Sequence, residues 1–125
     1  MHILLDTNIL YWWLYEIERL SGPARDLLAD AEGLYVSSAS IWEIAIKTSI
    51  GKMDAKVDHV LEQIETKDLH ALPITFAHAR RVVELHLHHK DPFDRLLIAQ
   101  AITEQFNLLT ADTKLKPYSN LVLCV

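Results

Sequence analysis

The chain has 125 residues, half of them hydrophobic and 23% charged, so it is long enough to form one domain, residues 1–125, with a substantial core. Its formal net charge of −5 disfavours a protein that binds nucleic acid passively through a basic surface. The absence of a long apolar run, of a secretory-type start and of a second cysteine beside Cys124 predicts a cytoplasmic protein with no membrane partner.

The N-terminal half alternates short apolar runs with helical patterns. Residues 2–6 predict a buried strand, and residues 8–15 predict a helix. Ser21 is a predicted N-cap for a helix that extends to about residue 31. Residues 34–37 predict a second strand, and residues 38–50 predict a helix that ends at Gly51, where a C-cap glycine is favoured.

The C-terminal half continues the alternation. A helix is predicted to begin at Asp54 or Ala55, and residues 69–74 predict a short strand that Pro73 interrupts. Thr75 is a predicted cap for a helix that runs to about residue 87, and Pro92 is typical of the first turn of a helix that runs to about residue 106. The last two predicted strands are residues 107–110 and 121–125.

Short strands separated by helices predict βαβ units and therefore a parallel sheet. The strand runs are mostly continuous apolar segments, which is expected when helices cover both faces of a sheet. We therefore predict an α/β fold, a three-layer α/β/α sandwich with a central parallel sheet of about five strands.

Acidic residues follow the predicted strands at the sheet edge where open parallel sheets bind ligands. Asp6 ends the first strand, Glu43 lies just inside the helix after the second, and Asp112 follows the fourth; Asp94 lies in the first turn of the helix near Pro92. Carboxylates brought together repel and raise each other's pKa, and a shared divalent cation relieves this. An all-oxygen ligand set favours Mg²⁺ or Mn²⁺.

Each acid also has a purely structural interpretation, as a helix cap, a first-turn residue or a turn residue. Any one acid fits such a role at least as well as a catalytic one, whereas several acids at one predicted edge favour a metal site. The structural alternatives are Asp6 as a cap, Ser40 with Glu43 as a capping box, Asp91 as an N-cap before Asp94, and Asp112 as a turn residue.

Four stretches, LLDTNILYWW, SSASIWEIAIK, HKDPFDRLLIAQA and LLTADTKL, span nearly the whole chain in this order. In order and spacing they resemble the PIN-domain ribonucleases, and among them the VapC-type toxins of toxin–antitoxin pairs. The resemblance implies a metal-dependent endoribonuclease in which a metal-activated water attacks an RNA phosphodiester. It implies that the catalytic and metal-binding acids are Asp6, Glu43, Asp94 and Asp112.

Within that set, the resemblance implies that Asp6 and Asp94 form the central pair and that the other two acids reach the metals through water. It also implies supporting roles for Asn8, Ser38 and Thr110 in orienting carboxylates or waters, and we rank Asp91 as a second supporting acid or an N-cap. The cations near the site are either RNA phosphate contacts or solvated surface charges: Lys90, Arg95, Lys114 and Lys116.

The resemblance further implies a homodimer and a cognate antitoxin partner. Part of the aromatic helix is expected to contact a partner, because aromatic residues are enriched at interface cores. The histidines of HLHHKD do not follow a usual zinc spacing and more simply end a surface helix. The residues concerned are Tyr11, Trp12, Trp13 and Tyr15 for the aromatic helix, and His86, His88 and His89 for the histidines.

Three other functions compete with this hypothesis. A phosphatase of haloacid-dehalogenase type normally has a second aspartate two positions after the first, where this chain has Asn8. A phosphoacceptor receiver domain needs an aspartate at the end of the third strand, and LHALPIT has none. A catalytically inactive PIN-like interaction module would use the acids only as helix caps.

Overall fold

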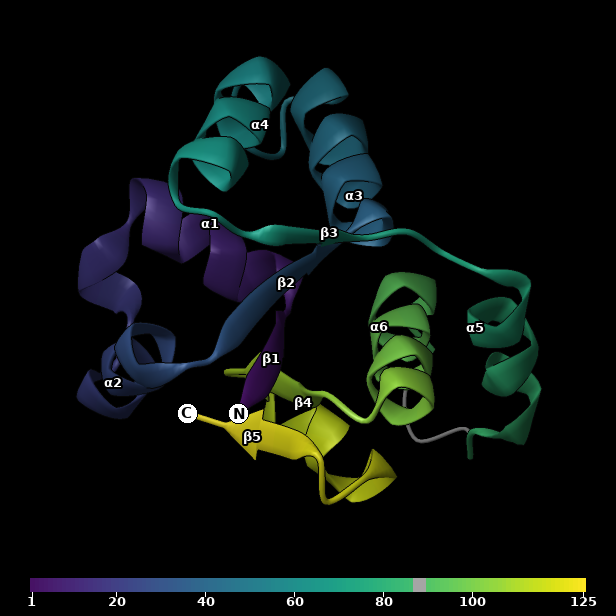
Figure 1. The fold of residues 1–125 in the computed structure, drawn as a ribbon. Helices are drawn as coiled ribbons and strands as arrows, with labels where there is room; N and C mark the ends of the chain where they lie inside the picture. The colour runs from purple at the N-terminus through teal and green to yellow at the C-terminus, as the bar shows by residue number, and fades with distance from the viewer. Residues whose placement is uncertain (87–89) are drawn as a thin grey trace.

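The computed structural model describes residues 1–86 and 90–125. Five strands form one parallel sheet in the order β3-β2-β1-β4-β5, with helices on both of its faces (Figure 1). The predicted three-layer α/β/α architecture is therefore confirmed. The strands are β1 (His2–Leu5), β2 (Gly33–Ser37), β3 (His70–Leu72), β4 (Asn107–Thr110) and β5 (Val122–Cys124).

The predicted capping residues Ser21 and Thr75 cap the helices that follow them. Ser21 Oγ accepts the Ala24 N–H at 3.2 Å, and Thr75 caps its helix in a reciprocal pair with His78. Gly51 follows its helix with φ +76°, a conformation that favours glycine. The α-helices are α1 (Thr7–Tyr15), α2 (Gly22–Asp30), α3 (Ser38–Ser49), α4 (Val57–Thr66), α5 (Phe76–Arg81) and α6 (Pro92–Glu104).

Three short 3₁₀ segments join these elements: η1 (Ile17–Arg19), η2 (Val82–Glu84) and η3 (Thr113–Tyr118). No helix in the described parts of the chain is both long enough and apolar enough to cross a membrane.

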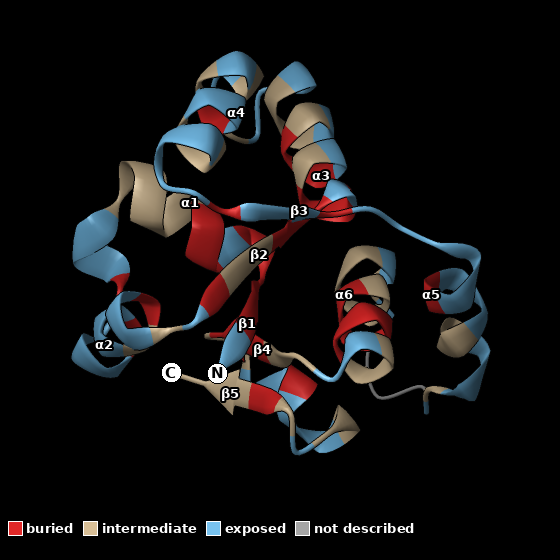
Figure 2. Ribbon diagram, viewed as in Figure 1, coloured by how far each residue is buried: buried red, intermediate tan, exposed pale blue. Residues whose placement is uncertain are grey.

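Strand β1 is the centre of the core. Ile3 and Leu5 point into the core shared with α1, α2 and α4, whereas Leu4 belongs to the opposite core, against α6. This alternation follows from the two-residue period of a strand. All three side chains are fully buried, and Figure 2 shows the buried residues gathered along the central strands and the inward faces of α1 and α6.

Strands are added on one side of β1 first and then on its other side, so β1 is the point at which the strand order switches. The chain builds β2 and β3 on one side of β1 and then returns to place β4 and β5 on the other side. Such a switch leaves a crevice at the carboxyl ends of the two strands that flank it, here β1 and β4. The Asp6 N–H donates to the Leu109 carbonyl at 3.1 Å, so these two strand ends are held together where the crevice begins.

Most boundaries agree to within about one residue, and the clearest differences concern β3, α4 and α5. Strand β3 is shorter than residues 69–74, since Pro73 has no N–H to continue the ladder. Helix α4 begins at Val57 rather than at Asp54 or Ala55, because Ala55 is buried in the core ahead of the helix. The helix after Thr75 ends at Arg81 and tightens into η2; the predicted end at residue 87 lies outside the described residues.

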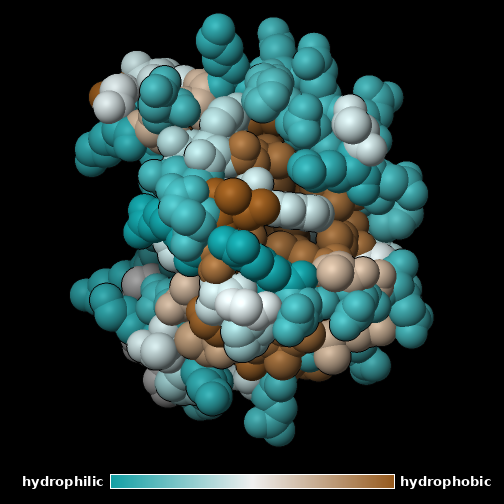
Figure 3. Space-filling model, turned by 90° about the vertical axis from the view of Figure 1, so that its left-hand side faces the viewer, coloured by the Kyte–Doolittle hydropathy of each residue, from teal (hydrophilic) through white to brown (hydrophobic). Residues whose placement is uncertain are grey.

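The face that carries α1 and α2 is chemically mixed. Figure 3 shows hydrophobic residues gathered in the middle of this face, with hydrophilic residues around them. The aromatic residues of α1 are only partly buried and pack against the core, so part of each ring stays accessible on this helix. They are Tyr11, Trp12, Trp13 and Tyr15.

Candidate active site

Asp6 sits at the carboxyl end of β1 and is both a helix cap and a buried acid. Its Oδ1 accepts the Ile9 N–H at 2.8 Å as the N-cap of α1. Its Oδ2 accepts a hydrogen bond from the Thr110 hydroxyl at 2.5 Å, and the residue is only 5% exposed. The capping interpretation is thus correct, and it also fixes the orientation of the carboxylate.

The electrostatic setting of Asp6 is that of a shared acidic site. Burial raises the pKa of Asp6 from 3.8 to about 7, and the hydrogen bonds from Thr110 and Ile9 oppose this rise. The negative charges of Asp94 and Glu43 make smaller upward contributions to this value. Three acids from different parts of the sequence therefore lie close enough to affect one another.

Glu43 lies in the middle of α3 and is 6% exposed. Its Oε2 forms an ion pair with the Lys47 ammonium, which lies 2.7 Å away and one helical turn along α3. Its Oε1 is buried and has no hydrogen-bond partner among the described residues. A buried carboxylate oxygen without a donor is costly, so this atom is available to bind a cation.

The capping-box interpretation of Ser40 with Glu43 is wrong. Ser37 is the N-cap of α3, and its Oγ accepts the Ala39 N–H at 3.0 Å. Ser40 instead accepts a hydrogen bond from the Thr7 hydroxyl at 3.0 Å, and both residues are buried. This bond ties the first turn of α1 to α3, so the helix that follows Asp6 and the helix that carries Glu43 are held together.

Asp91 and Asp94 occupy the start of α6. Asp91 Oδ1 accepts the N–H groups of Phe93 at 2.8 Å and of Asp94 at 3.2 Å, so its predicted N-cap role is confirmed. Asp94 follows in the first turn, where the helix dipole stabilises a negative charge. The carboxylate of Asp91 is thereby engaged with the helix end, whereas Asp94 interacts electrostatically with Asp6.

Asp112 is joined to the site through Thr110. The Asp112 N–H donates to Thr110 Oγ1 at 3.0 Å, while the hydroxyl of Thr110 donates to Asp6. The Asp112 Oδ1 accepts the Lys114 N–H at 3.0 Å and caps η3. Thr110 thus hydrogen-bonds to both the Asp6 carboxylate and the Asp112 N–H, and its supporting role in catalysis stays a prediction.

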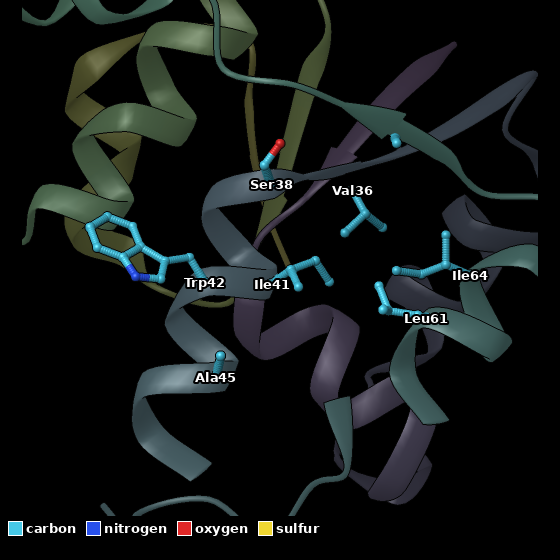
Figure 4. A pocket seen from close by; sticks show the side chains of 8 residues that line it. Val36, Ser38, Ile41, Trp42, Ala45, Leu61 and Ile64 are labelled. Atoms are coloured by element: carbon cyan, nitrogen blue, oxygen red, sulfur yellow. The ribbon is translucent and has the colours of Figure 1, made fainter. Parts of the chain in front are cut away.

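The other two predicted supporting residues have different surroundings. Asn8 is exposed and lines a polar cavity between α1 and α3. The Ser38 hydroxyl donates to the Leu72 carbonyl at 3.4 Å, and Ser38 lines an apolar groove beside α3 (Figure 4). Neither has a recorded hydrogen bond to the predicted acids, so their supporting roles stay predictions.

The predicted phosphate contacts fall into two groups. Arg95 donates to the backbone carbonyls of Val82 at 3.3 Å and His86 at 3.0 Å, so its guanidinium holds the connection before α6 against that helix. Three cations are exposed and accessible to a ligand: Lys90, Lys114 and Lys116. His88 and His89 of the histidine run lie outside the described residues.

The chemistry of the acids fits a hard divalent cation. No three His, Cys, Asp or Glu side chains within residues 1–86 and 90–125 form a ready-made metal cage. Mg²⁺ does not require one, because it keeps several waters and binds through one or two carboxylates. A cation between the acids would give the unpartnered oxygen of Glu43 a partner and would stabilise the charged form of Asp6, whose pKa is raised.

The PIN domain family model matches residues 3–121 of the chain. The chain belongs to the PIN domain family. It is 30% identical over 119 residues to Ribonuclease VapC22 of Mycobacterium tuberculosis, covering 93% of this chain and 91% of that protein.

Solved structures of toxin–antitoxin complexes share the fold of this PIN domain. One is the VapBC2 complex of Rickettsia felis bound to a promoter DNA fragment, with a TM-score of 0.73 and 20% identity over 98% of this chain and 97% of that one. Another is a toxin–antitoxin complex from Klebsiella pneumoniae, with a TM-score of 0.67 and 20% identity over 97% and 95% of the two chains.

The family match and the strand order decide between the competing enzyme classes. A receiver domain has the flavodoxin-like order 2-1-3-4-5, which differs from the order 3-2-1-4-5 found here. The match to the PIN domain over most of the chain also decides against a phosphatase of haloacid-dehalogenase type. The inactive interaction module belongs to the same family and therefore stays a competing function.

Sequence reasoning missed the residues that join α1 to α3. The hydrogen bond from Thr7 to Ser40 spans 33 residues, and no local pattern indicates that these hydroxyls meet. The only available signal was that both lie in motifs that also carry a predicted catalytic acid. The polar cavity between the same two helices, which Lys47 lines, was likewise not predicted.

Proposed function

We propose that this PIN-domain protein is a metal-dependent endoribonuclease that hydrolyses RNA phosphodiester bonds and serves as the toxin of a toxin–antitoxin pair. The observation that carries the proposal is the buried Asp6 carboxylate, which Thr110 orients and whose pKa Asp94 and Glu43 raise. The similarity to Ribonuclease VapC22 supports RNA as the substrate.

Mg²⁺ or Mn²⁺ would be held by Asp6, Asp94 and Glu43. Asp112 is connected to this set because Thr110 is hydrogen-bonded to both Asp6 and Asp112. A divalent cation at this place supplies a water of lowered pKa and stabilises the negative charge that develops on the phosphate. The protein's own contribution is orientation: the Ile9 N–H and the Thr110 hydroxyl each hold one oxygen of Asp6. Lys47 holds one oxygen of Glu43 and leaves the other available.

The test is RNA cleavage by the purified chain, free of any partner, with Mg²⁺ or Mn²⁺ and then with EDTA. Asp94→Asn is the decisive variant, because it removes one charge from the acidic site and keeps the size of the side chain. Asp58→Asn on α4 is the matched control, since Asp58 is also a first-turn aspartate but is not among the charges that act on Asp6.

Cleavage that requires metal and is lost in Asp94→Asn while Asp58→Asn retains it supports the proposal. Cleavage that persists in EDTA contradicts the metal-dependent mechanism. A folded protein that binds no Mn²⁺ in a calorimetric titration and cuts no RNA supports the inactive interaction module. That alternative is favoured by one observation, which is that Asp6, Asp91 and Asp112 all cap helices.

The proposed protein partner is a cognate antitoxin, as the similarity to solved toxin–antitoxin complexes suggests. An apolar groove of about 390 Å³ lies between α3 and α4, and Figure 4 shows Trp42, Ile41 and Leu61 around it. Trp42 is 61% exposed and makes an edge contact with Phe93. An amphipathic segment of the antitoxin would cover this exposed apolar surface.

We further propose a cytoplasmic homodimer. Phe76 of α5 and Val83 of η2 are 96% and 86% exposed, and this apolar surface favours a contact with a second copy of the chain. Light scattering of the purified protein measures the mass in solution. A mass of one chain at micromolar concentration contradicts the dimer without affecting the nuclease proposal.

A further inference from the structure

A polar cavity lies between α1 and α3, and its lining does not include Lys90, Lys114 or Lys116. It has a volume of about 470 Å³, within the usual range for a small-ligand site. Residues of α1, η1, α3 and the segment before α4 line it: Asn8, Tyr11, Trp12, Glu16, Arg19, Lys47, Lys52, Met53 and Asp54.

The cavity is connected to the acidic site by two of its residues. The Lys47 ammonium lies 2.7 Å from Glu43 Oε2, so the same side chain contacts a predicted catalytic acid and lines the cavity. Asn8 lies two residues after Asp6, in the first turn of α1. An RNA strand with one phosphate at the acids would therefore have its neighbouring nucleotide beside this cavity.

The charge of the cavity lining is opposite to that of the protein. Three cations and two acids line it, whereas the whole chain has a net charge of −5. Arg19 lies 3.6 Å from Glu16, and the two side chains are 54% and 38% exposed, so solvent weakens this ion pair. Lys52 is exposed and makes no ion pair with the described residues, which leaves its ammonium available for a phosphate.

The cavity also contains planar groups suited to a nucleobase. The Arg19 guanidinium carbon lies over the Trp12 ring, 4.5 Å from its centre, so the two form a cation–π pair. Tyr11 packs beside Tyr15 with ring centres 5.1 Å apart, and its hydroxyl donates to the Asp54 carbonyl at 3.4 Å. Unpaired RNA bases stack on aromatic rings and on guanidinium planes, and cations beside them hold the backbone.

We propose that this cavity binds one unpaired nucleotide of single-stranded RNA next to the phosphodiester that is cut. The base stacks on the Arg19–Trp12 pair, and the adjoining phosphate contacts Lys52 and Lys47. This subsite rests on the proposed nuclease function and specifies where the nucleotide next to the cleaved phosphodiester binds. An acidic peptide would match the cations, but it would leave the aromatic and guanidinium planes without a stacking partner.

The first measurement is RNA binding in EDTA, where metal-dependent cutting is prevented. Fluorescence anisotropy follows the binding of an end-labelled single-stranded oligoribonucleotide of about twelve nucleotides and mixed sequence. Lys52→Glu reverses a charge inside the cavity, and Lys67→Glu makes the same change on an exposed residue outside its lining. We expect Kd to rise about fivefold to tenfold for Lys52→Glu and less than about twofold for Lys67→Glu.

A photo-cross-link tests the stacking part of the proposal. The same oligonucleotide carrying 4-thiouridine should cross-link to the peptide that contains Tyr11 and Trp12, and polyglutamate should compete poorly for the site. Three results overturn the subsite: no RNA binding by the unmodified chain, equal weakening by the two charge reversals, or cross-links only to peptides outside the cavity. Displacement by polyglutamate at lower concentration than by RNA assigns the cavity to an acidic peptide instead.

Cleavage kinetics with Mn²⁺ separate this inference from the nuclease proposal. We expect Lys52→Glu to raise KM, with the larger part of the loss in KM rather than in kcat, because Lys52 does not contact the acids. If the unmodified chain cuts no RNA yet binds it in the cavity, the nuclease proposal fails and the binding site stands. If the chain cuts RNA and both variants have equal KM, the subsite fails and the nuclease proposal stands.

Discussion

Trp42 and Glu43 are neighbours on α3 and invert the usual order of burial. The indole side chain is 61% exposed, whereas the carboxylate is 6% exposed. Burying a charge costs free energy unless it is paired, and exposing a large aromatic residue forfeits the gain of burying it. Lys47 pairs only one oxygen of Glu43, and Phe93 contacts only an edge of Trp42. The proposed cation would pair the remaining oxygen, and the proposed antitoxin segment would cover the exposed indole.

The two sides of α3 therefore have different roles. One side faces the acids at the ends of β1 and β4, where oxygens are held by hydrogen bonds from Thr110 and Lys47. The other side lines the apolar groove with Ile41 and Ala45. On this helix, exposure alone does not distinguish structural from functional residues, whereas a departure from the expected burial of a residue type does.

The largest expected effect tests the buried acids. Asp6→Asn should lower kcat for RNA cleavage by more than about 100-fold, because it removes a charge from the metal site. The same variant should raise the free energy of unfolding by roughly 2 kcal/mol at pH 8 in EDTA, because it replaces a buried carboxylate whose pKa is about 7. Cleavage kinetics and thermal unfolding measure the two effects.

Asp26→Asn on the exposed face of α2 is the control for this variant and should change neither quantity. A lower Tm for Asp6→Asn in EDTA would mean that the cap on Ile9 and the bond from Thr110 outweigh the cost of burying the charge. That outcome would make Asp6 a structural residue first and would weaken the contrast between Glu43 and Trp42.

The next effect is the pH dependence of stability. The Asp6 pKa is raised from 3.8 to about 7 in the folded protein, so the folded state holds this proton more tightly than the unfolded state. Between pH 4 and 7 the Asp6 contribution should therefore fall as pH rises, by at most about 1.4 kcal/mol per pH unit. Denaturant unfolding in EDTA of the unmodified chain minus Asp6→Asn isolates this contribution.

Added Mn²⁺ should oppose this loss at pH 8 and have little effect at pH 5, since the proton on Asp6 competes with the cation. A pH profile that is identical in the unmodified chain and in Asp6→Asn would show that Asp6 ionises at an ordinary pKa, and the acids would then not share one site.

The smallest expected effect tests the exposed side of α3. Trp42→Ser should weaken binding of the cognate antitoxin about fivefold to tenfold and leave kcat for RNA unchanged within about twofold. Ile50→Ser is the matched control, because Ile50 is the C-cap residue of α3 and is also exposed, but it does not line the groove. Surface plasmon resonance against the purified antitoxin measures both. Equal affinities for the two variants would contradict the groove as its binding site.

The sequence was sufficient for the features that depend on local pattern. Asp6 follows the apolar run that predicts the first strand, and the N-cap alternative for Asp91 follows from its position directly before Pro92. The alternation of apolar strands and helices predicted the sandwich. Such features involve residues a few positions apart, so their physics is visible in a short window.

Tertiary structure decided which residues meet. The bond from Thr110 to Asp6 spans 104 positions, and the contact between Tyr11 and the Asp54 carbonyl spans 43. The early end of β3 and the late start of α4 depend likewise on packing around Pro73 and Ala55. A local pattern records which face of an element is buried but not which element covers it; only the folded chain brought the acids together at the end of β1 and formed the cavity beside them.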